Sequence, residues 1–227
     1  MKERPIIFSA PMVRAILEGR KTQTRRVVKP RPAPRGSFVT NSPGDPGYIA
    51  WCDLEDIDRM FCKDAERHWH TAVCPYGVIG DRLWVRETCQ PVVGHPTLDD
   101  GFATMYRADG ALVFHTEAEA EYMRVAKREA GRETWPDRAA PGCWKPSIYM
   151  PRWASRITLE IADVRVERLQ DISEEDARAE GVDAGQNMRE GSCRDLYSVL
   201  WDSINGDGAW ASNPWVWALT FKRGGAA

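Results

Sequence analysis

The sequence lacks the features that mark membrane-spanning and secreted proteins. No apolar run approaches the roughly 20 residues that a transmembrane helix needs, and the first five residues contain no apolar signal segment. The six cysteines are spaced irregularly over 227 residues and include no Cys-x-x-Cys pair, unlike the dense disulfide framework of a small secreted domain. We therefore expect a cytoplasmic protein with reduced thiols and no membrane partner.

Net charge is also nearly absent, but its distribution is uneven. The formal net charge is -2, yet residues 1–40 contain ten Lys or Arg and only two Glu. Residues 41–76 contain seven Asp or Glu and three Lys or Arg, so this stretch is acidic. Solvated surface charge explains both stretches, and a basic end that attracts phosphate groups is the alternative.

Histidine is scarce, and five of the ten His and Cys residues lie in one stretch, residues 52–74. Thiolate and imidazole groups can together hold zinc in a tetrahedral site. The candidate ligands are Cys52, Cys62, His68, His70 and Cys74. Because the close Cys-x-x-Cys spacing of zinc knuckles is missing, we expect ordinary thiols, with no metal and no cofactor.

Strand and helix patterns alternate along the chain, which indicates an α+β fold. Apolar spacing, capping residues and turn residues predict these elements. The expected strands cover residues 6–8, 21–28, 82–86, 157–166 with a bulge near 162–163, and 216–221, and the expected helices cover 11–17, 173–180 and 192–205. In the last helix, we expect Leu196, Val199 and Leu200 to form the apolar face.

Two stretches interrupt this pattern as insertions of about residues 31–76 and 91–142. The first is rich in Pro, Gly and acidic residues without clear periodicity, and we expect it to lie over the surface. In the second, Asp109-Gly110 predicts a tight hairpin, and residues 117–130 suit a charged helix. We expect one elaborated domain over residues 1–227.

Two motifs resemble a known family, the ASCH domains. These are Ile16-Leu17-Glu18-Gly19-Arg20-Lys21-Thr22-Gln23-Thr24-Arg25-Arg26, and Gly80-Asp81-Arg82-Leu83 at the start of a strand. An Ala-x-x-Glu-Gly helix end and an apolar closing strand also fit. The resemblance covers roughly residues 5–30, 77–90 and 143–223, and is closest to long, phage-borne members. It implies a small PUA-like β-barrel with short flanking helices.

The same resemblance implies an enzymatic activity. Members with a similar Gly-Arg-Lys-Thr-x-Thr segment are amidohydrolases that remove acyl groups from the N4 amine of cytosine nucleosides. Carried over by position, their nucleophile falls on Thr24, their lysine on Lys21 and their carboxylate on Glu180. The implied substrate is therefore N4-acylated cytosine or cytidine, such as N4-acetylcytidine.

This chemistry is reasonable for the residue types involved. A threonine hydroxyl attacks an amide only when a base takes its proton, and burial or positive neighbours can lower a lysine pKa enough for that task. A carboxylic acid can protonate the leaving amine. In a regular strand, residues 21 and 24 point to opposite faces, so Lys21 must still belong to the turn after Gly19. If the segment has no catalytic role, it is simply a basic strand of the sheet.

Further residues are candidates for holding the substrate. We expect this role for Phe8, Arg26, Trp84, Glu87 and Arg152. Arginine beside tryptophan suits a stacked base and its phosphates, although core packing accounts for such a tryptophan equally well. Glu87 is the alternative catalytic carboxylate, and an ion pair is its structural explanation.

Two other functions remain open at this point. One is a noncatalytic module that binds RNA or modified nucleotides through its basic end and its aromatic residues. The other is a ribonuclease, because a basic cleft could also position a phosphodiester.

Overall fold

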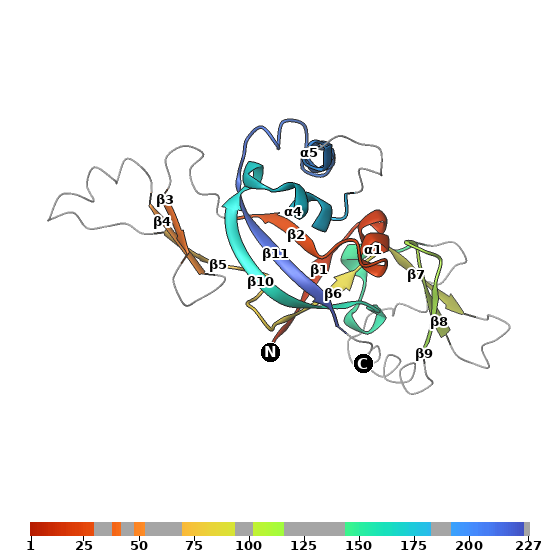
Figure 1. Ribbon diagram of the computed structural model, residues 1–227. Coiled ribbons are helices and arrows are strands. Elements are labelled where there is room, and N and C mark those ends of the chain that lie inside the picture. Colours follow the sequence, from red (N-terminus) through yellow and green to blue (C-terminus); the bar gives the residue numbers. More distant parts are fainter. Residues whose placement is uncertain are drawn as a thin grey trace, which may run out of the picture.

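The computed structural model describes residues 1–29, 38–41, 48–52, 70–93, 102–115, 144–182 and 192–224. Within this part of the chain the fold is α+β, with one central sheet, short helices and two smaller sheets. Figure 1 shows the small sheets on opposite sides of the central one.

The central sheet has five strands in the order β1-β6-β10-β11-β2. These strands are β1 (Glu3–Ile7), β6 (Arg82–Arg86), β10 (Thr158–Arg168), β11 (Trp215–Arg223) and β2 (Gln23–Val27). Strands β1 and β6 pair in parallel, and the other pairs are antiparallel. The long strand β10 curves strongly (Figure 1), and the buried residues of β11 belong to two apolar clusters, one on each face of the strand.

The core of this sheet follows from alternating strand residues. In β6, Leu83 and Val85 are buried while Trp84 and Arg86 are partly exposed, as the alternation predicts. The register of β10 against β11 shifts between Ile161 and Asp163, which confirms the expected bulge. Strand β11 lies between β10 and β2, so that its apolar residues are buried on both faces as expected.

Within the described residues, three α-helices accompany the sheet: α1 (Ala10–Leu17), α4 (Glu174–Ala179) and α5 (Ser192–Asn205). Helix α1 has proline in its first turn and ends before Gly19, which has a positive φ of 76°. Helix α4 begins at Ser173, whose side chain accepts a hydrogen bond from the Asp176 amide. The helices expected over residues 11–17, 173–180 and 192–205 are thus confirmed to within one residue at each end.

The expected apolar face of α5 is wrong at one position. Val199 is 68% exposed, whereas Cys193, Tyr197 and Trp201 are buried against α4 and β11. These three residues are spaced four apart and therefore share one side of the helix. Tyr197 and Trp201 bury more apolar area than Val199 could, so the aromatic side faces the core.

The insertions contain two three-stranded antiparallel sheets. The first consists of β3 (Phe38–Asn41), β4 (Tyr48–Cys52) and β5 (His70–Val73), and the second of β7 (Cys89–Val93), β8 (Phe102–Tyr106) and β9 (Leu112–His115). A turn containing Asp109 and Gly110 joins β8 to β9, which confirms the predicted hairpin. The helix expected over residues 117–130 lies outside the described residues. No helix in the described ranges combines the length and apolar character of a membrane span.

Gly181 provides a test of how closely the end of α4 packs against Lys21. Its φ is +88°, and an added Cβ would lie 3.0 Å from the Cβ atoms of Ala15 and Lys21. We expect Gly181→Ala to lower the free energy of unfolding by roughly 2–4 kcal/mol, through backbone strain and overpacking. Gly206→Ala is the matched control, because Gly206 also has a positive φ but no atom within 4 Å of the added Cβ. Urea denaturation should show a clearly larger loss for Gly181→Ala, and equal losses would contradict the close packing.

Candidate functional site

The segment after Gly19 joins two distant parts of the chain. Lys21 forms an isolated antiparallel bridge with Glu180, the residue that follows α4. The amide of Thr22 donates to the Ala179 carbonyl, and β2 begins one residue later. Lys21 therefore precedes the regular strand, so that strict alternation does not fix its direction relative to Thr24.

Lys21 and Glu180 form a buried ion pair. Lys21 Nζ lies 2.6 Å from Glu180 Oε2 and 2.8 Å from the Glu180 carbonyl oxygen. The two residues are 2% and 3% exposed, respectively. Taking both charges out of water is costly, so this pair depends on the additional hydrogen bonds around it.

Tyr197 and Arg25 complete the surroundings of the Glu180 carboxylate. The Tyr197 hydroxyl donates to Glu180 Oε1 at 3.1 Å, and Arg25 Nη1 lies 3.5 Å from the same oxygen. Both carboxylate oxygens thus have a partner, which orients the group. Burial raises the pKa of the Tyr197 hydroxyl well above its ordinary value, and the nearby Glu180 charge adds to this shift.

Burial also shifts the titration of Lys21. Desolvation lowers the pKa of the Lys21 ammonium below its ordinary value, while the Glu180 carboxylate raises it and the positive charges of Arg26 and Arg25 lower it again. The net shift is downward, in the direction that a general base requires.

Arg25 is a structural centre of this region. Its side chain is fully buried and pairs with Glu167 and Asp176, while Gln23 Oε1 accepts from its guanidinium. In the sequence, Arg25 is one residue of the basic segment that resembles the ASCH motif. In the structure it lies within 3.5 Å of three carboxylates, including Glu180, and joins β2 to β10 and α4.

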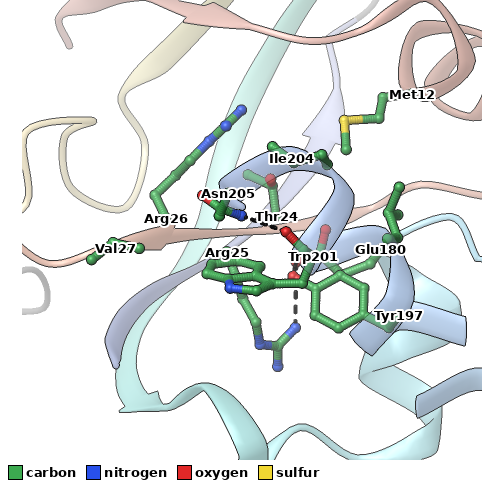
Figure 2. Close-up of a pocket in the computed structure, with 11 residues that line it drawn as sticks. Met12, Thr24, Arg25, Arg26, Val27, Glu180, Tyr197, Trp201, Ile204 and Asn205 are labelled. Carbon is green, nitrogen blue, oxygen red and sulfur yellow. Dashed lines mark hydrogen bonds and ion pairs between the residues drawn. The ribbon is translucent and has the colours of Figure 1, made fainter. Parts of the chain in front are cut away.

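A pocket of about 60 Å³ lies between β2 and α5. Figure 2 shows its lining residues as sticks. They are Met12, Thr24, Arg25, Arg26, Val27, Glu180, Tyr197, Leu200, Trp201, Ile204 and Asn205. The pocket thus brings together three residues that the sequence predicted for the site, Thr24, Arg26 and Glu180.

The side chains of β2 alternate at this pocket. In Figure 2, Thr24 and Arg26 rise from one side of the strand, whereas Arg25 points away from them toward Glu180. Lys21 does not line the pocket, but its ammonium binds the carboxylate of Glu180, and Glu180 lines the pocket. Glu180 therefore connects the Lys21 ammonium to the pocket in which Thr24 lies.

Phe8 lies beside the same cluster, although it does not line the pocket. It is 2% exposed, and its ring is 5.7 Å from Lys21 Nζ and 5.4 Å from Arg26 Cζ. Arg26 Nη2 also donates to the carbonyl of Ile7 at 2.7 Å. The Phe8 ring thus makes cation-π contacts with both basic side chains, Lys21 and Arg26.

Trp84 and Arg152 lie together on another face of the sheet. The guanidinium of Arg152 is 5.9 Å from the Trp84 ring, and that of Arg86 is 5.5 Å from it. Arg152 also pairs with Glu3 at 2.9 Å. These residues lie outside the pocket lining, so their expected role in substrate binding stays a prediction.

Glu87 is likewise separate from the pocket and belongs to a second buried network. Arg156 binds both oxygens of Glu87, at 2.9 and 3.0 Å, and also binds Asp109. The Arg156 guanidinium lies 4.0 Å from the centre of the Tyr106 ring. Burial raises the pKa of Glu87, and Arg156 opposes this shift. The ion pair considered for Glu87 from the sequence is present, but its partner is Arg156 instead of Arg82 or Arg86.

The described residues offer no cluster for a metal ion. No group of three or more His, Cys, Asp or Glu in these ranges is arranged to hold one. Cys62 and His68 of the zinc hypothesis lie outside the described residues, as do the side chains of Cys52 and His70. Cys74 is buried, and burial raises the pKa of its thiol to about 11.

Two aromatic residues of the pocket, Tyr197 and Trp201, did not appear among the expected site residues. Their signal in the sequence is the spacing of four that they share with Cys193 on α5.

Comparisons with protein-family models, with curated proteins and with solved structures find no match to this chain.

The titration of Lys21 can be measured directly. We expect the side-chain ammonium of Lys21, followed by the ¹³Cε shift in lysine-labelled protein, to titrate below the ordinary 10.5. Glu180→Gln should lower this pKa further, because the carboxylate favours the charged ammonium. Tyr197→Phe is the control, since it alters a partner of Glu180 without removing the negative charge. A Lys21 pKa at or above 10.5, or an upward shift in Glu180→Gln, would contradict the described burial.

The second buried network predicts a large effect on stability. Arg156→Met should lower the free energy of unfolding by about 3–5 kcal/mol, because Glu87 would be left buried without a partner. In this variant the folded-state pKa of Glu87 should rise further above its unfolded value, so the deficit should shrink as the pH falls below that pKa. Arg152→Met removes an exposed pair with Glu3 and should cost about 0–1 kcal/mol. Similar losses in both variants at pH 8, measured by chemical denaturation, would contradict this account.

Proposed function

We propose that this chain is an amidohydrolase of the ASCH type, built on a PUA-like barrel, that deacylates N4-acylated cytosine or cytidine. The observation that carries the proposal is the buried Lys21–Glu180 pair, whose carboxylate lines the same pocket as Thr24. The strongly curved strand β10 supports the barrel, and the segment from Gly19 to Arg26 supports the family.

The proposed reaction uses three groups. In the proposed reaction the Thr24 oxygen attacks the acyl carbon, and its proton passes through the Glu180 carboxylate to the neutral Lys21 amine. The bond between the acyl carbon and N4 then breaks, and the departing amine takes this proton back from the Lys21 ammonium through the Glu180 carboxyl group, so that Lys21 is neutral again. Water hydrolyses the acyl-threonine and releases the carboxylic acid, which restores the hydroxyl.

Arg26 has a suitable place to support this reaction. It lies on the Thr24 side of β2 and lines the pocket with it (Figure 2). A cationic donor near the acyl oxygen stabilises the negative charge that develops during the attack. The Lys21 ammonium needs to lose its proton before it can act, and its lowered pKa makes this easier.

A noncatalytic role in binding nucleic acid is the second candidate. The observation that favours it is the Trp84 ring, which has the guanidinium groups of Arg86 and Arg152 at 5.5 and 5.9 Å from its centre. Such a surface suits bases and phosphates. This candidate predicts RNA binding that weakens with salt and survives the loss of the Thr24 hydroxyl.

Turnover of N4-acetylcytidine tests the proposed function. We expect Thr24→Val to lose at least about 10³-fold in the rate of cytidine release, because this change keeps the side-chain shape and removes the nucleophile. Thr22→Val is the matched control: Thr22 is exposed two residues away, and its variant should retain activity. Chromatography of the nucleosides measures the release. If the wild-type protein releases no cytidine from substrates with several different acyl groups, the proposed function is wrong.

A further inference from the structure

Two residues that line the pocket carry buried polar atoms for which the folded chain provides no partner. Among the described residues, six buried side-chain nitrogen or oxygen atoms have no hydrogen-bond partner. Two of them, Arg26 Nε and Trp201 Nε1, belong to residues that line the pocket. A buried donor without a partner is unfavourable, so such atoms in a pocket indicate where a ligand acceptor binds.

Trp201 is the more informative of the two. It is 4% exposed, and α5 holds it in a cluster with Tyr197 and Trp210. Its ring packs among apolar residues, and its backbone carbonyl accepts from Asn205 Nδ2 at 3.0 Å. The ring is therefore held in place, and its N–H donor cannot turn toward another partner without repacking α5.

The two unpartnered donors lie at different places in the pocket. Arg26 rises on the Thr24 side of β2, whereas in the view of Figure 2 the Trp201 ring lies across the strand, beside Tyr197. Arg26 is thus the donor close to the reacting acyl group. The Trp201 N–H can therefore donate to an acceptor on the part of the ligand that does not react.

The edge of β2 adds backbone groups to the same pocket. The Phe221 amide donates to the Thr22 carbonyl, and the Val28 amide donates to the Trp215 carbonyl. Thr22 and Val28 are therefore in hydrogen-bonded pairs with the β11 side of the sheet. Hydrogen-bonded and non-hydrogen-bonded pairs alternate in an antiparallel sheet, so the backbone N–H and C=O groups of Arg25 and Val27 point away from β11. Both residues line the pocket, which suits the amide-like edge of a heterocyclic base.

The remaining lining is apolar and lies near an exposed end. Met12, Leu200 and Ile204 contribute to it, and Ile204 at the end of α5 is 52% exposed. One edge of a flat ring can therefore enter from this end, with apolar side chains against its faces and donors at its rim.

From these features, and resting on the proposed function, we propose that Trp201 Nε1 donates a hydrogen bond to the ring carbonyl O2 of a pyrimidine base. Trp201 is then a specificity-determining residue that selects cytosine-type ligands over rings without this oxygen. A site built to hydrogen-bond a ligand group discriminates strongly against an analogue that lacks it, because the buried donor is left unpaired.

Binding of two small rings to the full-length chain tests this assignment. Cytosine has the O2 carbonyl, and 4-aminopyrimidine lacks it. By calorimetry, we expect wild-type protein to bind cytosine about 10-fold to 100-fold more tightly than 4-aminopyrimidine. Trp201→Phe keeps an aromatic ring and removes the N–H, so this preference should fall to within about threefold, while the affinity for 4-aminopyrimidine stays nearly unchanged.

Trp215→Phe is the matched control. Trp215 Nε1 is also buried without a partner, but Trp215 does not line the pocket. This variant should keep the full preference for cytosine. The assignment is overturned if Trp201→Phe retains the preference, if it weakens both ligands equally, or if wild-type protein binds neither ring.

Failure of this assignment can be distinguished from failure of the proposed function. Calorimetry with the two rings requires no turnover. Binding of cytosine that depends on Trp201, without release of cytidine from N4-acetylcytidine, would support the binding role and reject the hydrolase. Release of cytidine that is unaffected by Trp201→Phe, with an unchanged preference for cytosine, would support the hydrolase and reject the binding role of Trp201.

Discussion

The buried contact between the Lys21 ammonium and the Glu180 carboxylate is the interaction on which the site depends. It joins the turn after α1 to the end of α4, two segments that are 159 residues apart in the chain. Both charges are removed from water, so the contact needs the hydroxyl of Tyr197 and the guanidinium of Arg25 around it. The same burial that makes the pair costly also lowers the pKa of Lys21, which is the property that a base requires.

Much of the fold could be predicted from the sequence, because its signals are local. Proline at the start of α1, Gly19 at its end and the Ser173 cap of α4 all act within a few residues. The alternation in β6 and the bulge in β10 are also local patterns. The order of the strands depends on contacts between distant residues, and no local pattern contains that information.

The site was predicted only in part, for the same physical reason. Lys21, Thr24 and Glu180 were expected from a resemblance, but the contact that joins Lys21 to Glu180 appears only when the chain folds. Arg25 resembled a surface arginine in the sequence, although it is buried among carboxylates. On α5, Val199 was expected to be buried because it is apolar, while the larger Tyr197 and Trp201 occupy the buried side.

The central claim is that Thr24 forms a covalent intermediate in the pocket that Lys21 and Glu180 support. The most direct measurement is mass spectrometry of the protein after acid quenching during turnover of N4-acetylcytidine. The account predicts the added mass of one acetyl group on the peptide that contains Thr24, and its absence in Thr24→Val. Release of cytidine by wild-type protein with no acetyl group on Thr24 at any quench time, and with full activity in Thr24→Val, would contradict it.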